Sequence, residues 1–247
     1  MVAPYFERDG IVIYHGDCRD ILPSIEPASV GLLLSDPPYG INLDTANAAR
    51  GRGGPVGGRK STATTGRVKQ AIAHSTDYPP VFGDAEPFDP SPLLAYPRLI
   101  LFGANHFAPR LPDSPSWLVW DKTAGLVAKK RLIGFCDNAD AELIWTNLGG
   151  PVRILGHQWI GLMKATERGV ARVHPTQKPV ALLRWLIEMY SKPGDLILDP
   201  YMGSGSTLEA ARDTGRRCIG IEVSEAYCEI AARRLDQLTL FGSEASA

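Results

Sequence analysis

The sequence predicts an α/β fold built on a mostly parallel, twisted sheet with helices on both faces. Two segments, one near each end of the 247-residue chain, show the pattern of strand, helix and strand. In each segment an apolar run ends close to an acidic residue, a helical stretch follows, and a second apolar run comes next. Two such units are typical of a parallel sheet, because parallel strands need a crossover connection between them.

The N-terminal unit places an acidic tetrapeptide at the end of a strand. Residues 11–14 predict a strand, and a helix is expected over residues 19–25. Residues 30–34 are again apolar and have the length of a buried strand. The tetrapeptide Asp36-Pro37-Pro38-Tyr39 follows after one serine. Because ligands of open α/β sheets gather at the carboxyl ends of strands, the tetrapeptide is a candidate site.

The C-terminal unit places a glycine-rich turn between a strand and a helix. Its parts follow one another directly: a strand at residues 196–198, a turn at 199–206, a helix at 207–212 that Gly215 ends, and a strand at 218–221. Such a turn places backbone N–H groups and the positive end of a helix beside a ligand. No lysine follows the glycines as in a phosphate-binding loop, and Leu208 stands where a dinucleotide fingerprint has its third glycine. A different nucleoside is therefore indicated.

Glu222 ends the last of these strands, about 20 residues after the turn, where a carboxylate can accept hydrogen bonds from two ribose hydroxyls. The alternative is a plain tight turn whose acidic residue only caps a strand. The order of strand, turn, helix, strand and acid favours the nucleoside site.

The middle of the chain adds further elements to the same sheet. Apolar runs at residues 99–102, 117–120 and 142–145 each have the length of a strand and lie near Pro, Gly or Asp. Residues 179–190 carry apolar side chains at helical spacing, and Pro179 fits the first turn of that helix. The tryptophans are expected to pack in the core and not to stack on bases: Trp117, Trp120, Trp145 and Trp159.

Composition favours a soluble globular protein. The chain is 44% hydrophobic and long enough for one domain over residues 1–247, and no window approaches the roughly 20 apolar residues that span a bilayer. We therefore expect a cytoplasmic protein without a membrane partner. The four cysteines lack metal-ligand spacing, so buried thiols and no metal are expected. The net charge of −1 alone gives no reason to expect a polyanionic partner, but residues 45–76 contain no acidic residue and six basic ones.

The tetrapeptide has the chemistry to bind an exocyclic amino group. The Asp36 carboxylate and a proline carbonyl only accept hydrogen bonds, so together they can take both hydrogens of such a group. The two prolines fix the backbone before a substrate arrives, and Tyr39 offers a flat face for stacking of a base. A plain turn is the alternative, since Pro-Pro and Pro-Tyr-Gly are common in turns.

With these motifs in place, the chain resembles the S-adenosylmethionine-dependent DNA amino-methyltransferases, which modify adenine N6 or cytosine N4. Three segments carry the resemblance: Asp36 to Tyr39, the sequence His174-Pro175-Thr176-Gln177-Lys178-Pro179, and Asp199 to Gly205. Their order, with the catalytic half first, is the beta order of that family. Tyr201-Met202 departs from the Phe and small residue common there. The resemblance implies a Rossmann-like methyltransferase fold with inserted loops for DNA recognition.

The resemblance also implies the residues of the site. The catalytic residues would be Asp36, Pro37, Pro38 and Tyr39. S-adenosyl-L-methionine would be bound by Asp17, Cys18, Asp36, Thr176, Gln177, Lys178, Asp199, Pro200, Tyr201, Gly203, Ser204, Gly205 and Glu222. In this set Asp17 would lie near the cofactor adenine, unless it only caps a helix, and Lys178 near the methionine end, unless it is a solvated residue at a helix start.

The resemblance predicts methyl transfer to N6 of an adenine that is flipped out of double-stranded DNA, as in restriction-modification systems. Adenine is the first choice because Asp36 leads the tetrapeptide, where cytosine N4 enzymes more often carry Ser. Cytosine N4 is the alternative, and a non-catalytic nucleic-acid-binding module that keeps the fold is an alternative from another class. A ring-carbon mechanism is disfavoured because no cysteine has a proline neighbour. A homodimer is considered as a further assembly.

Two segments are expected to face DNA. A loop over residues 42–80 adjoins the tetrapeptide and carries the candidate phosphate contacts Arg50, Arg52, Arg59, Lys60, Arg67 and Lys69. A target-recognition insertion is expected at about residues 123–172, where further basic residues occur. For both segments an ordinary solvated, charged surface is the alternative.

Overall fold

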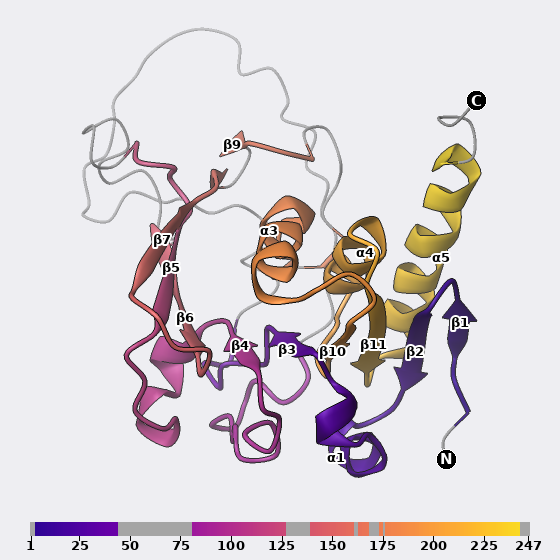
Figure 1. Ribbon diagram of the computed structural model, residues 1–247, viewed down its shortest axis with the longest axis horizontal. Helices are drawn as coiled ribbons and strands as arrows, with labels where there is room; N and C mark the ends of the chain where they lie inside the picture. Colours follow the sequence, from indigo (N-terminus) through magenta and orange to yellow (C-terminus); the bar gives the residue numbers. More distant parts are fainter. Residues whose placement is uncertain are drawn as a thin grey trace, which may run out of the picture.

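The computed structural model describes residues 3–43, 81–126, 139–160, 163–167, 173–174 and 176–242. Within these residues the chain forms a nine-stranded sheet and a separate two-stranded one (Figure 1). The strands of the large sheet, in chain order, are β1 (Phe6–Arg8), β2 (Ile11–His15), β3 (Leu32–Ser35), β4 (Leu99–Leu101), β5 (Trp117–Asp121), β6 (Ala141–Thr146), β7 (Arg153–Gly156), β10 (Leu196–Asp199) and β11 (Arg217–Glu222). The small sheet pairs β8 (Trp159–Ile160) with β9 (Met163–Lys164).

The described helices differ in length and in position. Four are α-helices: α1 (Cys18–Ile21), α3 (Val180–Tyr190), α4 (Ser206–Asp213) and α5 (Glu225–Gly242). Four are single 3₁₀ turns: η1 (Leu22–Ser24), η2 (Pro27–Ser29), η3 (Ala104–His106) and η4 (Ala108–Arg110). None of the described helices is both long and apolar enough to cross a membrane.

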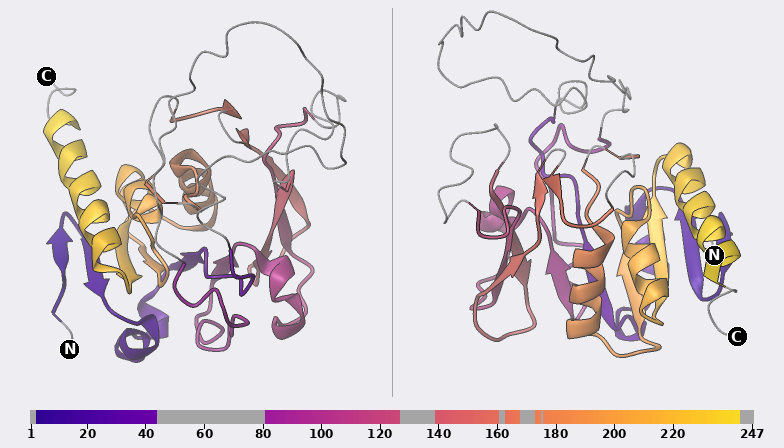
Figure 2. Two further views of the ribbon diagram at one scale, coloured as in Figure 1. Left: turned by 180° about the vertical axis from the view of Figure 1, so that it is seen from behind. Right: turned by 90° about the horizontal axis from the view of Figure 1, so that it is seen from above.

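The order of the strands confirms the predicted fold class. The sheet runs β1-β2-β11-β10-β3-β4-β6-β5-β7. Neighbours from β2 to β4 are parallel, while β6 runs antiparallel to both β4 and β5. The apolar faces of α3, α4 and α5 pack on one face of the sheet, a layer that the views of Figure 2 show. The other face is covered mainly by α1, the 3₁₀ turns and the segment around Phe88 to Tyr96.

Local sequence explains where several elements begin and end. The predicted helix over 19–25 is split into α1 and η1, because Pro23 lacks the N–H that would continue an α-helix. Pro179 is the N-cap of α3 and not part of its first turn, one residue from the prediction. Gly215 follows α4 with φ +70° and its N–H bonds to the carbonyl of Arg212, as expected for a glycine that ends a helix.

The core contains the aromatic side chains that the sequence assigned to it. Trp120, Trp145 and Trp159 are buried, and Trp117 is half-buried. Cys18, Cys218 and Cys228 are buried free thiols, as expected, while Cys136 lies outside the described residues. Among the described residues no group of three or more His, Cys, Asp or Glu could hold a metal ion.

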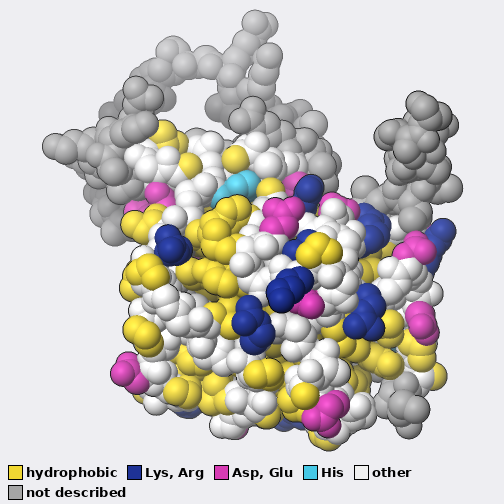
Figure 3. All heavy atoms as spheres, viewed as in Figure 1, with side chains coloured by type: hydrophobic (Ala, Val, Ile, Leu, Met, Phe, Trp, Pro, Cys, Tyr) yellow, Lys and Arg dark blue, Asp and Glu magenta, His cyan; other side chains and the backbone are white. Residues whose placement is uncertain are grey.

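The edge strand β7 and the residues next to it expose apolar side chains. Ile154 on this edge strand is 73% exposed and neighbouring Val152 is 57% exposed. Apolar side chains gather on the side of Figure 3 where Figure 1 shows β5 and β7. This edge belongs to the predicted insertion at 123–172, of which residues 127–138, 161–162 and 168–172 lie outside the described part.

Candidate active site

The two predicted sites meet at neighbouring strand ends. Strands β3 and β10 pair in parallel, with Leu33 opposite Leu198, so the residues that follow each strand leave the sheet side by side. The buried Ser35 hydroxyl donates a hydrogen bond of 2.6 Å to Asp199 Oδ1. This bond joins the start of the tetrapeptide to the start of the glycine-rich turn. Burial raises the pKa of Asp199 to about 6, although hydrogen bonds from Ser35, Thr207 and the Tyr201 backbone oppose the shift.

The glycine-rich turn is held against Glu222. The Gly203 N–H donates to Glu222 Oε2 at 3.0 Å, and the Ser224 N–H donates to Oε1 at 2.8 Å. Gly203 and Gly205 have φ of +51° and +82°, in the left-handed region that favours glycine. A Cβ at Gly205 would also lie 2.8 Å from the Ala231 Cβ on α5. The turn therefore requires glycine at position 205 both for its backbone and for its packing.

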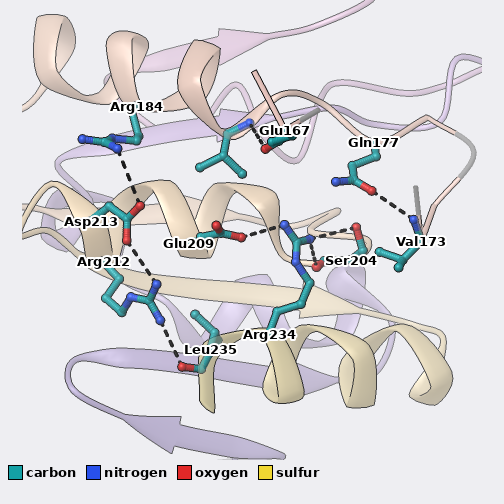
Figure 4. Close-up of polar contacts among 11 residues, drawn as sticks. Glu167, Val173, Gln177, Arg184, Ser204, Glu209, Arg212, Asp213, Arg234 and Leu235 are labelled. Carbon is teal, nitrogen blue, oxygen red and sulfur yellow. Dashed lines mark hydrogen bonds and ion pairs between the residues drawn. The ribbon is translucent and has the colours of Figure 1, made fainter. Parts of the chain in front are cut away.

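An ion pair between α5 and α4 supports the glycine-rich turn. Arg234 on α5 donates to the Ser204 carbonyl at 2.6 Å and to Glu209 Oε2 on α4 at 2.6 Å. Figure 4 shows its guanidinium between these two groups. In the same view Glu167 accepts a hydrogen bond of 3.1 Å from the Val180 N–H and so caps α3. Sequence reasoning did not identify Arg234, since α5 was not predicted.

The segment around His174 lies over the turn. A Cβ on Gly203 would lie 3.5 Å from the His174 ring, which also contacts Tyr227 with ring centroids 4.5 Å apart. Thr176 contacts His174 Nδ1 through its hydroxyl, at 3.1 Å, and Gln177 Oε1 accepts from the Val173 N–H at 3.1 Å. Burial lowers the pKa of His174 to about 4, and the Lys178 charge adds to this shift. The ring is therefore neutral at pH 7.

Lys178 connects this segment to the tetrapeptide. Its side chain is only 7% exposed, and Nζ lies 2.5 Å from Asp36 Oδ2 and 3.2 Å from the Tyr39 hydroxyl. The alternative of a solvated residue at a helix start is therefore wrong. Burial by itself would lower the pKa of Lys178, but Asp36 and Glu142 outweigh burial and raise it. The ammonium is charged and contacts the Asp36 carboxylate.

Both oxygens of the Asp36 carboxylate already have donors. The Tyr39 hydroxyl donates to Oδ1 at 2.5 Å, and Lys178 occupies Oδ2. Burial, with a contribution from the Glu142 charge, raises the pKa of Asp36 although Lys178 opposes the shift. The carboxylate is thus held in place by both donors, and each of its oxygens keeps one further acceptor site.

Two residues that sequence reasoning missed extend the ion pair. Glu142 on β6 lies with Oε2 3.4 Å from Lys178 Nζ and with Oε1 2.6 Å from Lys122 Nζ. Burial would raise the pKa of Glu142, but the two lysines outweigh burial and lower it. Asp36, Lys178, Glu142 and Lys122 therefore form one row of alternating charges. A glutamate within the apolar run 142–145 was the only local signal.

The Tyr39 ring is fixed by two contacts. It stacks on the exposed His106 ring, with centroids 5.0 Å apart and planes 13° apart. On another side Gly103 has φ +63°, and a Cβ there would lie 2.0 Å from the Tyr39 ring. Tyr39 therefore depends on a glycine whose role the sequence did not reveal.

Asp84 holds the backbone that follows the tetrapeptide. Its Oδ1 accepts from the Gly40 N–H at 2.8 Å and from the Ile41 N–H at 3.3 Å, and Oδ2 accepts from Leu43 at 2.6 Å. The Asn42 N–H donates to the Asp84 carbonyl at 2.8 Å. Residues 43 and 81, where the described chain stops and resumes, are thereby held in one place. The predicted phosphate contacts Arg50, Arg52, Arg59, Lys60, Arg67 and Lys69 lie outside the described residues.

Asp17 and Cys18 lie at the start of helix α1. Asp17 is the N-cap of this helix, where Oδ1 accepts from the Arg19 N–H at 2.9 Å, and it also pairs with the Arg19 side chain. The buried Cys18 side chain is hydrogen-bonded to that of Tyr201, which packs edge-on against Phe88 with centroids 5.7 Å apart. Helix capping is thus a role of Asp17 in the structure, and Cys18 contacts the glycine-rich turn through Tyr201.

Part of the chain matches a known family. Residues 137–233 match the model of the DNA methylase family, N6_N4_Mtase, a range that contains the turn and Glu222 but not the tetrapeptide. The chain is 22% identical to the type II methyltransferase M2.LlaDCHI of Lactococcus lactis subsp. cremoris, over 98% of this chain and 95% of the relative. The predicted resemblance to the DNA amino-methyltransferases is confirmed. A shorter match, 46% identical over 71 residues, covers 29% of this chain and 24% of DNA adenine methyltransferase YhdJ of Escherichia coli K12.

Solved structures confirm the Rossmann-like fold. The PvuII DNA methyltransferase, which is cytosine-N4-specific, aligns with a TM-score of 0.56 and 15% identity over 94% of this chain and 88% of its own. The DNA modification methylase TTHA0409 of Thermus thermophilus, in complex with S-adenosyl-L-methionine, aligns with a TM-score of 0.52 and 19% identity over 91% and 93% of the two chains.

Proposed function

We propose that the chain transfers a methyl group from S-adenosyl-L-methionine to the N6 amino group of an adenine that is flipped out of double-stranded DNA. The observation that carries the proposal is the meeting of two sites at the ends of β3 and β10. A carboxylate suited to an amino group leaves one strand, a nucleoside turn leaves the next, and the Ser35–Asp199 hydrogen bond joins them. One exocyclic amine and one methyl donor could therefore reach each other.

The residues of the turn fit S-adenosyl-L-methionine. Each Glu222 oxygen accepts one backbone N–H, which leaves acceptor sites on both for the ribose hydroxyls. The left-handed backbone at Gly203 and Gly205 lets the main chain approach a ligand closely. We assign the other predicted contacts to the same ligand: Asp17, Cys18, Thr176, Gln177, Asp199, Pro200, Tyr201 and Ser204. Lys178 was expected at the methionine end of the cofactor, but we assign it to the tetrapeptide, because its ammonium contacts Asp36.

The bound cofactor would supply a methyl group made electrophilic by its sulfonium. The task of the chain is then to orient the amine and to exclude water. Asp36 and the Pro37 carbonyl would accept the two amino hydrogens and direct the nitrogen lone pair toward the methyl group. After transfer the nitrogen has to lose a proton. Because its pKa is raised, Asp36 is better able to take that proton than an exposed aspartate is.

A base inside a duplex is blocked by pairing and stacking, so it must leave the helix before it can react. Tyr39 would stack on the extruded base, which would take the place that the exposed His106 ring occupies here. The cost of extrusion has to be offset by contacts with the DNA backbone. We assign these contacts to the basic residues of segment 42–80 and to the insertion at 123–172.

Adenine is the proposed base because Asp36 leads the tetrapeptide and because the 46% identical stretch is shared with an adenine methyltransferase. Cytosine N4 is the second candidate, since the neighbour with a TM-score of 0.56 is specific for that position. The two bases present a similar exocyclic amine, so the same site chemistry would serve either one.

The test is to incubate the purified protein with labelled S-adenosyl-L-methionine and DNA from a strain without amino-methylated bases. Mass spectrometry of the nucleosides should show N6-methyladenine, and sequencing of the product should give the recognised site. If N4-methylcytosine is found instead, the target base is cytosine and not adenine. If competing RNA is labelled in preference to DNA, the substrate is RNA.

Asp36→Ala is the matched variant. It should bind S-adenosyl-L-methionine with similar affinity in calorimetry and transfer no methyl group, because the amine has lost its acceptor. Undiminished transfer would remove Asp36 from its role. Cofactor or DNA binding without any transfer by the wild type would favour a non-catalytic binding module.

A further inference from the structure

Asp36 presents a problem for the reaction proposed above. Each oxygen of this carboxylate already accepts one hydrogen bond, from Tyr39 or from Lys178, so a target amino group has to compete with these donors for the acceptor sites that remain. The Lys178 contact is the stronger obstacle, because it joins two opposite charges at 2.5 Å in a buried position. The ammonium needs a second partner if its contact with Oδ2 is to lengthen.

Glu142 has such a position open. Its Oε2 is buried and has no hydrogen-bond partner, although Lys178 Nζ lies 3.4 Å away. A buried carboxylate oxygen without a donor is costly, so it favours any arrangement that supplies one. Nζ would need to move only about 0.5 Å to reach the usual hydrogen-bond distance of roughly 2.9 Å from this oxygen.

Lys122 keeps the open oxygen directed at Lys178. It lies 2.6 Å from Glu142 Oε1, the other oxygen of the same carboxylate, and Glu142 is placed by the pairing of β6 with β5. The Lys178 ammonium is thus held between two carboxylates, with one short contact and one longer one.

We propose that Glu142 is a positioning residue which draws the Lys178 ammonium partly away from Asp36 when the target amino group arrives. The inference rests on the proposed methyl transfer. In this exchange Nζ shifts toward Glu142 Oε2 and its contact with Asp36 Oδ2 lengthens to at most about 3.0 Å, so the amine hydrogen can take the second acceptor site of Oδ2. Lys122 holds Glu142 ready for this exchange.

Glu142→Gln tests the exchange while keeping the side-chain volume. An amide has a single oxygen, which Lys122 would retain, so an NH₂ group that cannot accept would face Lys178. Transfer should fall by about tenfold to a hundredfold in kcat, the range expected for a lost charge-assisted hydrogen bond, and S-adenosyl-L-methionine affinity should be unchanged.

A double-mutant cycle shows whether Glu142 acts through Lys178. In a Lys178→Met background the Glu142→Gln change should cost less than about twofold, because no ammonium remains to be moved. Equal losses in both backgrounds would overturn the proposal. Glu142→Asp, which keeps the charge but withdraws the oxygen, should reproduce the loss if the glutamine variant does not fold.

A binding measurement without the cofactor gives a second readout. Two duplexes carry the mapped site, one with adenine and one with purine, which lacks the exocyclic amine, at the target position. The wild type should prefer the adenine duplex, and Glu142→Gln should lose that preference. If both proteins prefer the adenine duplex equally, the exchange is overturned and the proposed function still stands. If the wild type transfers no methyl group, the proposed function itself is contradicted.

Discussion

Asp199 offers a measurable link between the junction of the two sites and stability. Its pKa is raised from 3.8 to about 6 by burial at the end of β10, where it accepts the Ser35 hydrogen bond. In the folded protein this carboxyl therefore holds its proton to a higher pH than in the unfolded chain. The folded state binds more protons between these two values, so this group makes stability fall as the pH rises through that window.

The size of the effect follows from the shift. A change from 3.8 to about 6 corresponds to about 3 kcal/mol of unfolding free energy, present below pH 3.8 and lost above pH 6. Asp199→Asn keeps an oxygen for Ser35 and for the Tyr201 N–H but does not ionise. Relative to wild type, the variant should therefore gain up to about 3 kcal/mol between pH 4 and pH 7.

Urea unfolding of wild type and Asp199→Asn at several pH values measures this difference, in which most other titrating groups cancel. Ser35→Ala is the companion variant. It removes a hydrogen bond that lowers the Asp199 pKa, so it should steepen the loss of stability with pH. A difference between wild type and Asp199→Asn that does not change over this range would refute the reasoning.

Three further variants test other parts of the site. Gly103→Ala should lose about 1–3 kcal/mol of stability and most methyl transfer, because the new Cβ would clash with the Tyr39 ring and the backbone there is left-handed. Urea unfolding and the transfer assay measure these losses, and full activity would contradict the prediction. Asp84→Ala should lower kcat/KM for DNA by about tenfold or more without changing cofactor affinity, since three backbone N–H groups that follow Tyr39 lose their acceptor. Unchanged kinetics would show that these hydrogen bonds do not position the tetrapeptide. Glu222→Gln should weaken S-adenosyl-L-methionine binding in calorimetry by about tenfold, because an amide has one accepting oxygen where the carboxylate has two. Saturating cofactor should restore transfer. Equal affinity in both proteins would remove Glu222 from the ribose site.

Short-range patterns were enough to predict most of the sheet and both motifs. Strands β3, β10 and β11 are buried, so each is written in the sequence as a short apolar run. The turn at Gly203 and Gly205 needs a left-handed backbone, which glycine allows. Each of these signals lies within a few consecutive residues. Helix α5, the edge strands β1 and β7, and the small sheet of β8 and β9 were missed. Strands β1 and β7 leave most of their residues exposed, so they lack a buried apolar run.

The sequence by itself determined that an acidic tetrapeptide and a glycine-rich turn each follow a strand, because those signals are local. Only the tertiary structure decided what surrounds the Asp36 carboxylate. Lys178 comes from a segment 142 residues away, and Glu142 reaches the site through the pairing of β6 with β5. Burial then makes these separate charges interact strongly, since water no longer screens them. No local pattern contains that information.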